Sequence, residues 1–304
     1  MGIQETRIIL VPVDFTDLTE LALDHAVTLA SSFGYGIHIL HVTGKGQKSG
    51  LDEEEARPLM QQLSSSLAQE TGLLVKSSLA EGNVFKTIGM VADELQAAFV
   101  VMGVHGKKGV QHLVGSYAYQ VVCCANVPVL VVKQKHQSMG FKNIIVPIDF
   151  SRRSAQKVSQ AIKFAQFFGA TIRVFGFLSS TNKAKIINKE ALLKSITDFF
   201  KENGVKVTTD LMINPGMDWP DALMSFAREK DADLVMIVAE KGGRIQDIFT
   251  QNYTEKILDK VDVPVLTIMP TEADLEAEKD VDKAAFVTPF VDPLGFFSQT
   301  DRKF

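Results

Sequence analysis

Apolar and polar residues follow one another along this chain in blocks that predict strands and helices in regular alternation. Short apolar runs such as Arg7–Val13 and Ile37–Val42 predict strands that are covered on both faces. From Thr16 to Phe33 the apolar residues recur at helical spacing, and Gly34 can end that helix. The other elements expected in the first half are helices over Glu53–Thr71, Val84–Gln96 and Ser116–Ala125, and strands over Leu74–Leu79, Ala98–Gly103 and Val127–Val132. This alternation predicts the α/β class, with a doubly wound parallel sheet between helices.

The same succession occurs twice in the chain. Ile8–Phe15 aligns with Asn143–Phe150 at a shift of 135 residues, and Val127–Leu130 recurs as Val263–Leu266 at a shift of 136. A nearly constant shift at both ends of the copies indicates a duplication. We therefore predict two domains, repeat 1 over residues 1–135 and repeat 2 over residues 141–270, followed by a C-terminal tail over 271–304. The tail is expected to dock on its own domain or, as the alternative, on a partner or a ligand cleft.

Composition narrows the range of partners. With a net charge of −4 and a pI near 5.9, the chain lacks the general basic field of a nucleic-acid binder. Its apolar runs are far shorter than the ~20 residues that span a bilayer, so no membrane partner is expected. The only cysteines, Cys123 and Cys124, are adjacent and cannot form a disulfide framework, which favours a reducing, cytoplasmic location.

Candidate chemistry gathers where the strands of repeat 1 end. In an open α/β sheet, ligands bind beyond the carboxyl ends of the strands, at the point where the strand order reverses. Asp14 follows the first strand and can accept hydrogen bonds from a ribose. Glycines after the fourth strand let backbone amides converge on an anion, and Ser116 adds a hydroxyl at a helix start. The residues expected at this edge are Pro12, Val13, Asp14, Val42, Met102, Gly103, His105, Gly106, Gly115, Ser116 and Tyr117.

These features in this order resemble the universal stress protein family, whose ATP loop reads Gly-x2-Gly-x9-Gly-Ser/Thr after the fourth strand. The resemblance covers both repeats and implies Rossmann-like domains of the adenine-nucleotide-binding type that form a pseudo-two-fold pair. It implies that ATP, with or without Mg²⁺, binds to repeat 1. Asp14 and Val42 would hold the adenosine. The residues that would surround the phosphates are Gly103, His105, Gly106, Gly115 and Ser116, with Met102 and Tyr117 nearby.

The chain departs from the family pattern in both repeats. In repeat 1 the segment between Gly106 and Gly115 is one residue shorter than in the family pattern. Either the turn in this segment absorbs the missing residue, or the phosphate contacts are weakened. In repeat 2 the counterpart of Gly115-Ser116 is Gln251-Asn252, and Glu240 adds a negative charge. Repeat 2 is therefore predicted to have a degenerate loop and to serve as a packing partner.

No arrangement of residues typical of a catalytic or metal site is visible. His38 and His41 lie three apart on one strand and so face opposite ways, which excludes a shared metal; both are expected to be ordinary hydrogen-bonded histidines. The sequence favours a non-enzymatic, stress-response protein that binds ATP as a regulatory ligand. A nucleotide-independent scaffold with decayed loops and a slow ATPase remain the alternatives.

Assembly is predicted from the last strand of each repeat. Val129–Val132 and Val265–Ile268 are expected to pair within one chain as a pseudo-dimer, which removes two exposed edges. A homodimer of the whole chain and an unknown protein partner are left open.

Overall fold

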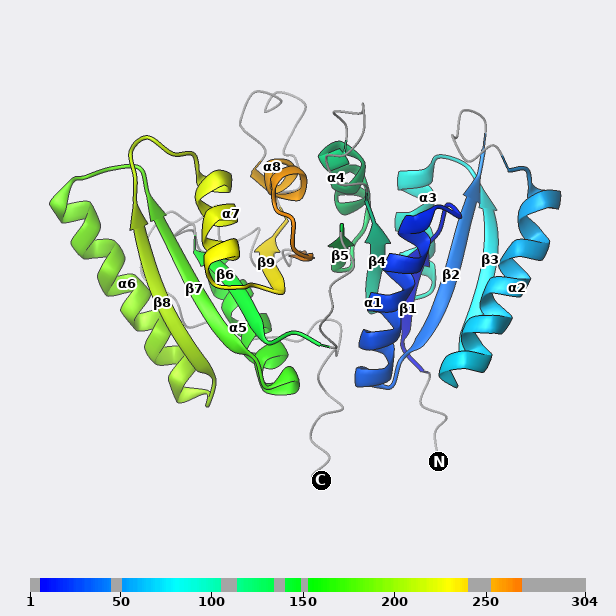
Figure 1. Ribbon diagram of the computed structural model, residues 1–304, viewed down its shortest axis with the longest axis horizontal. Helices are drawn as coiled ribbons and strands as arrows, with labels where there is room; N and C mark the ends of the chain where they lie inside the picture. The colour runs from blue at the N-terminus through cyan, green and yellow to red at the C-terminus, as the bar shows by residue number, and fades with distance from the viewer. Residues whose placement is uncertain are drawn as a thin grey trace. The chain divides into compact units, whose positions relative to one another are not determined.

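The computed structural model describes residues 6–44, 51–104, 114–133, 140–148, 153–239 and 253–269. By its internal contacts the chain divides into two compact units, one made of residues 1–139 with 240–259 and the other of residues 140–239 with 260–304. Each of the two repeats carries a sheet whose described pairings are all parallel (Figure 1). The predicted α/β class is confirmed.

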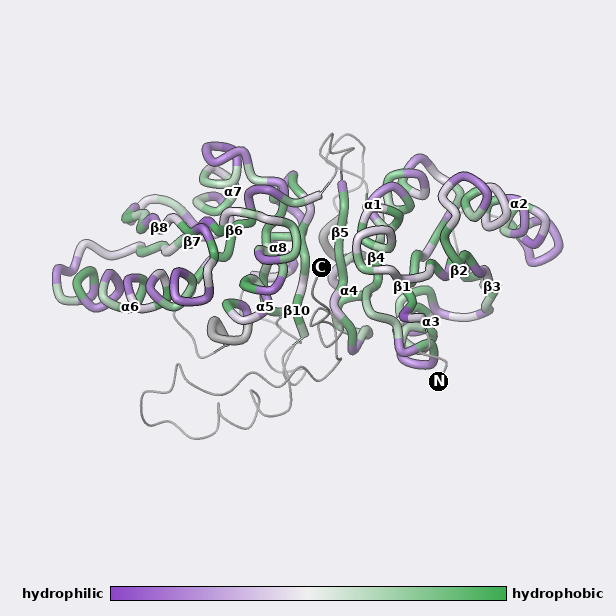
Figure 2. Tube along the Cα trace, turned by 90° about the horizontal axis from the view of Figure 1, so that it is seen from below, coloured by the Kyte–Doolittle hydropathy of each residue, from purple (hydrophilic) through white to green (hydrophobic). Residues whose placement is uncertain are grey.

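In repeat 1 the strand order is β3-β2-β1-β4-β5. Helices α1 and α2 cover one face of this sheet, and α3 and α4 cover the other (Figures 1 and 2). The elements are β1 (Ile8–Pro12), α1 (Asp17–Phe33), β2 (Gly36–Thr43), α2 (Glu53–Thr71), β3 (Val75–Glu81), α3 (Val84–Glu94), β4 (Phe99–Gly103), α4 (Val114–Cys124) and β5 (Val129–Val132).

Repeat 2 has the corresponding order β10-β9-β6-β7-β8. Its elements are β6 (Asn143–Ile148), α5 (Arg153–Phe168), β7 (Thr171–Leu178), α6 (Lys183–Glu202), β8 (Lys206–Ile213), α7 (Trp219–Glu229), β9 (Leu234–Val238), α8 (Tyr253–Lys260) and β10 (Val265–Ile268). The predicted pairing of the last strands of the two repeats stays a prediction.

The cores lie between the sheets and their helices. Ile9, Leu10 and Val11 of β1 are fully buried, as are Ile144, Ile145 and Val146 of β6. The strands are mainly hydrophobic, whereas hydrophobic and hydrophilic residues alternate around the helices (Figure 2). A central parallel strand needs this composition because helices cover both of its faces.

Capping residues fix the first helix as the sequence predicts. Thr16 is the N-cap of α1, and Gly34 ends the helix in the left-handed conformation with φ +68°. Helix α2 spans the predicted residues and starts with a capping box between Asp52 and Glu55. Helix α4 begins at Val114, two residues before the predicted start.

Candidate functional site

Three strand ends meet at one edge of the sheet in repeat 1. Strand β1 lies between β2 and β4, with Pro12 opposite Leu40 of β2 and Leu10 opposite Val100 of β4. From β1 the chain proceeds through β2 and β3 on one side, whereas β4 and β5 lie on the other. The strand order therefore reverses between β1 and β4, which is where an open α/β sheet binds its ligands.

Asp14 follows β1 at this edge, exposed to solvent and held by the start of α1. Its Oδ1 accepts hydrogen bonds from the Thr16 N–H at 3.1 Å and the Thr16 hydroxyl at 2.6 Å, with the Thr19 hydroxyl at 3.4 Å. All three bonds go to Oδ1, so Oδ2 takes no part in them. The start of α1 thus orients the carboxylate through Oδ1 alone.

The turn after β1 has an unusual backbone. Phe15 adopts φ +60°, a left-handed conformation that bulky residues rarely take. Its ring lies 4.9 Å from the imidazole of His41, centroid to centroid, with the two planes tilted by 47°. A strained residue of this kind persists only where its surroundings hold it in place. The packing against His41 is one such restraint.

His41 of β2 is 1% exposed and contacts the same turn through a hydrogen bond. Its Nδ1 lies 2.8 Å from the Val13 carbonyl oxygen, and since a carbonyl only accepts, Nδ1 carries the hydrogen. In the neutral ring Nε2 is then an acceptor. Within the described ranges, this Nε2 is the single buried side-chain nitrogen or oxygen without a hydrogen-bond partner. The expectation that His41 is fully hydrogen-bonded is therefore wrong for one of its two nitrogens.

His38 behaves as the sequence predicts. It is 9% exposed, and its Nε2 lies 2.8 Å from the hydroxyl oxygen of Ser78 on the neighbouring strand β3. Burial lowers the pKa of His38, and the positive charge of Lys76 lowers it further. The His38 ring therefore stays neutral to a lower pH than the ring of an ordinary histidine does.

The backbone of Val42 is left open on the side that faces β1. Beyond Pro12, β1 and β2 are joined by one more interstrand hydrogen bond, from the Val13 N–H to the Leu40 carbonyl oxygen at 2.8 Å. In a regular parallel ladder the next bond would join the Val42 N–H to the Val13 carbonyl. The described residues contain no such bond, and the Val13 carbonyl accepts a hydrogen bond from His41. Val42 therefore offers an N–H and a C=O beside Asp14.

The β4 side of the edge gives Gly103 a structural role. A Cβ at Gly103 would lie 2.6 Å from the Leu18 carbonyl oxygen and 2.8 Å from the Leu18 Cβ, so only glycine allows α1 to start this close to β4. Met102, the residue before it, is half-buried. Gly103 is thus required by packing in addition to any contact with phosphate.

The remaining candidates lie in or before α4. Gly115 and Ser116 are in its first turn, where backbone N–H groups have no partner within the helix. Tyr117 is 47% exposed, and its ring lies 5.4 Å from that of Phe85 on α3. His105 and Gly106 lie outside the described residues.

The corresponding edge of repeat 2 is built differently. Lys157 of α5 is 2% exposed and donates from Nζ to the Pro147 carbonyl at 2.6 Å. The residue of repeat 1 that aligns with Lys157 is Ala22, so this cation is specific to repeat 2. The rest of the predicted loop, including Glu240, Gln251 and Asn252, lies outside the described residues.

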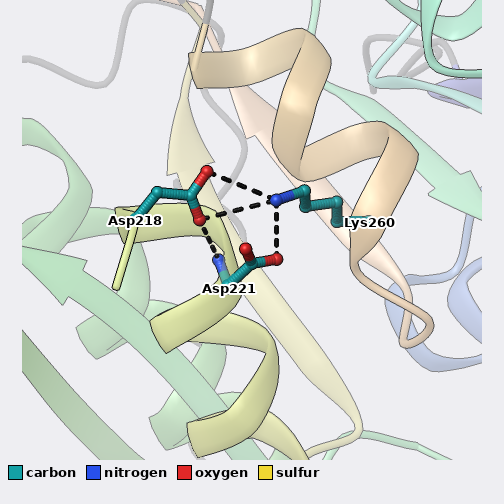
Figure 3. A network of polar contacts seen from close by, with 3 residues as sticks. All are labelled: Asp218, Asp221 and Lys260. Atoms are coloured by element: carbon teal, nitrogen blue, oxygen red, sulfur yellow. Dashed lines mark hydrogen bonds and ion pairs between the residues drawn. The ribbon is translucent and has the colours of Figure 1, made fainter. Parts of the chain in front are cut away.

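A second polar network in repeat 2 joins the end of α8 to the start of α7 (Figure 3). The Lys260 ammonium lies 2.6 Å from Asp221 Oδ1 and 3.3 Å from Asp218 Oδ2, and Asp218 also caps α7 by accepting from the Asp221 N–H at 3.0 Å. The hydrogen bond to Asp221 is the main reason why the pKa of Lys260 is raised. Desolvation acts to raise the pKa of Asp218, but the bonds from Asp221 and Lys260 outweigh it and lower that pKa. These contacts hold the end of α8 to the start of α7, which is a structural role.

Other chemistry is sparse in the described part of the chain. Among those residues, no group of three or more His, Cys, Asp or Glu side chains is arranged to hold a metal ion. Cys123 and Cys124 are half-buried thiols outside any disulfide. None of the helices within the described ranges is both long and apolar enough to cross a bilayer.

The fold and this edge define a class: duplicated, doubly wound α/β proteins whose first repeat keeps an open switch point. Comparison with known proteins agrees with that class. A sequence model of the universal stress protein family matches residues 5–133 and again residues 140–268. The chain belongs to the universal stress protein family, as a tandem member with two family domains.

Individual relatives support this assignment. A universal stress protein of Methanocaldococcus jannaschii is 30% identical over 138 residues, which are 41% of this chain and 81% of that protein. Universal stress protein G of Shigella flexneri is 31% identical over 142 residues, 42% of this chain and 99% of that protein. A crystal structure of a universal stress protein from Archaeoglobus fulgidus shares the fold with a TM-score of 0.71 at 16% identity, covering 88% of this chain and 97% of its own.

Proposed function

We propose that repeat 1 binds ATP or a related adenine nucleotide at the β1–β4 switch point and that the nucleotide acts as a regulatory ligand. The observation that carries the proposal is the open Val42 backbone next to the oriented carboxylate of Asp14. Adenine presents a hydrogen-bond acceptor beside its amino donor, and a backbone N–H with its neighbouring C=O complements that pair. Asp14 Oδ2 would accept a hydrogen bond from a ribose hydroxyl.

The phosphates would lie toward α4. The first turn of α4 carries Gly115 and Ser116, and its N–H groups, together with the positive end of the helix dipole, favour an anion. His105 and Gly106 complete the proposed set of phosphate contacts. Mg²⁺ would then be held mainly by the phosphates, since Asp14 is the one carboxylate we place at this edge.

This edge is better equipped for binding than for catalysis. Phosphoryl transfer needs a positioned metal and a located nucleophile. The described part of the edge contributes one carboxylate, which the start of α1 already holds. We therefore propose a cytoplasmic binding protein in which nucleotide occupancy changes the surface that a protein partner recognises. Repeat 2 serves as the packing partner in an intramolecular pseudo-dimer.

Calorimetric titration of the whole chain with ATP, with and without Mg²⁺, tests the proposal. Asp14→Asn keeps an acceptor for the α1 cap but loses the charge, and we expect ATP affinity to fall by ~10-fold, the effect of about one charge-assisted hydrogen bond. Asp149→Asn, at the aligned position of repeat 2, is the matched control and should bind ATP as the wild type does.

Three outcomes would count against the proposal. Wild-type protein that gives no heat with ATP, ADP or AMP, and that releases no adenine absorbance on acid treatment, would leave the scaffold alternative. Weaker binding by Asp149→Asn together with wild-type binding by Asp14→Asn would move the site to repeat 2. Accumulation of ADP during prolonged incubation would make the protein an ATPase rather than a binding protein.

A further inference from the structure

We propose that His41 is a positioning residue that keeps the Val42 backbone unpaired by taking the Val13 carbonyl for itself. What then occupies the open backbone rests on the proposed function, whereas the competition between His41 and Val42 does not. The proposal adds a histidine of the second strand to the site as a residue that acts through the neighbouring backbone.

The geometry at the end of β1 gives the first argument. A parallel ladder would continue from the bond between the Val13 N–H and Leu40 to a bond between the Val42 N–H and the Val13 carbonyl. His41 Nδ1 lies 2.8 Å from that carbonyl, and β1 ends at Pro12 instead of extending to Val13. The side chain of β2 therefore replaces the backbone bond that its own next residue would make.

Repeat 2 provides a comparison within the same chain. At the position that aligns with His41 it has Gly176, which has no side chain to donate. There the strand extends one residue further, because β6 includes Ile148 and pairs it with Gly176. Ile148 aligns with Val13, and the pair Pro147–Phe175 aligns with the last pair of repeat 1, Pro12–Leu40. The ladder thus continues where the histidine is missing and stops where it is present.

The state of the imidazole gives a third argument. Its Nε2 is buried without a partner, and burying an unpaired polar atom costs stability. An apolar side chain would fill the same space beside Phe15 without that cost. A histidine at this position is therefore poorly explained by packing alone, whereas the single donor at Nδ1 explains it.

Three variants of the whole chain test the role of His41. His41→Gly copies repeat 2, His41→Leu keeps the bulk beside Phe15 but has no donor, and His41→Asn keeps a donor at about the position of Nδ1. In nucleotide-free protein we measure the exchange of the Val42 amide hydrogen by NMR, together with the scalar coupling across a hydrogen bond from Val42 N–H to the Val13 carbonyl. Nucleotide affinity is then measured by calorimetry with ATP.

We expect the coupling to be absent in the wild type and in His41→Asn and to appear in His41→Gly and His41→Leu. In those two variants the Val42 amide should exchange at least ~10-fold more slowly and ATP should bind ~10-fold more weakly, the effect of about one hydrogen bond. His38→Leu, on the same strand but bonded to Ser78, is the control and should leave the Val42 exchange unchanged.

Unchanged Val42 exchange and no new coupling in folded His41→Leu would overturn the role of His41. If His41→Gly fails to fold, His41→Leu gives the same test, because it retains the apolar contact with Phe15. Wild-type protein that gives no heat with ATP would overturn the proposed function alone, since the exchange and coupling measurements contain no nucleotide. Altered exchange with unchanged ATP affinity would show that the nucleotide does not use the Val42 backbone, and would overturn that part of the inference.

Discussion

Gly103→Ala tests whether the glycine at the end of β4 is needed by the fold before any ligand binds. The added Cβ would lie 2.6 Å from the Leu18 carbonyl oxygen and 2.8 Å from the Leu18 Cβ. A relaxed carbon–oxygen contact is ~3.3 Å, so the first turn of α1 would have to move by about 0.7 Å. That turn is held by the Thr16 cap and by the hydrogen bonds to Asp14, so moving it lowers the stability of the folded protein.

The expected loss follows from two opposing terms. Overpacking of a well-packed region costs about 1–3 kcal/mol, whereas replacing glycine by alanine stabilises by about 0.4–1 kcal/mol through the unfolded chain. We expect a net decrease of about 1–2 kcal/mol in the free energy of unfolding. The conformation of Gly103 adds no further term, because its φ lies outside the left-handed range.

Urea unfolding followed by circular dichroism, in the absence of nucleotide, measures this loss. Gly216→Ala in repeat 2 is the matched control, because its nearest neighbour would lie 3.6 Å from the new Cβ, an ordinary contact. The control should change stability by less than about 0.5 kcal/mol. Gly103→Ala protein as stable as the wild type would refute the packing role and leave phosphate binding as the reason for the glycine.

Three further predictions concern stability. Lys260→Met should lower the free energy of unfolding by about 0.5–1 kcal/mol, which is the range of partly exposed ion pairs. Fluorescence of the sole tryptophan follows the unfolding. The control is Lys201→Met, which replaces an exposed lysine and should have no measurable effect. Because Asp221 raises the pKa of Lys260, that contribution is complete below about pH 10.4 and is lost as the pH rises through the raised pKa, so the difference between Lys260→Met and wild type should shrink above that pH. The lowered pKa of His38 means that the unfolded chain takes up a proton first as the pH falls below about 6.5, so urea midpoints should fall between pH 7 and 5, and fall less in His38→Gln. Thr16→Ala removes the N-cap of α1 and should cost about 1 kcal/mol in urea unfolding; a loss below 0.3 kcal/mol would contradict the capping role.

Much of the fold could be predicted because its determinants are local and repeated. The apolar run that forms β1, the cap at Thr16 and the stop at Gly34 each act within a few residues, and the structure confirms them. The duplication shows in the sequence because both copies need the same strand and helix faces buried. The sequence predicts the start of α4 two residues late, since Gly115 and Ser116 are typical of a helix start, yet the helix begins at Val114.

The candidate site was less accessible to sequence reasoning. The strand ends that carry Asp14, Val42 and Gly103 follow from topology, and the structure brings them to one edge. The contact between Gly103 and Leu18 depends on how α1 crosses β4, which no local pattern contains. The sequence predicts an ordinary core histidine at position 41, because an unpaired Nε2 depends on neighbours that are distant in sequence.

The two repeats together separate what determines the fold from what determines the open edge. Both copies have the same strand order and the same register at the start of the pairing, from Ile8 with Gly36 and from Asn143 with Thr171. The pairing of the first two strands differs at its end: it stops at Pro12 and Leu40 in repeat 1 and continues to Ile148 and Gly176 in repeat 2, where glycine stands at the position of His41. A single side chain can stop a ladder there at little cost to the fold, because the bonds before it are already made. A difference at this edge after duplication therefore requires one change within a buried strand, at the position of His41 and Gly176, and leaves the strand order and the earlier pairs unchanged.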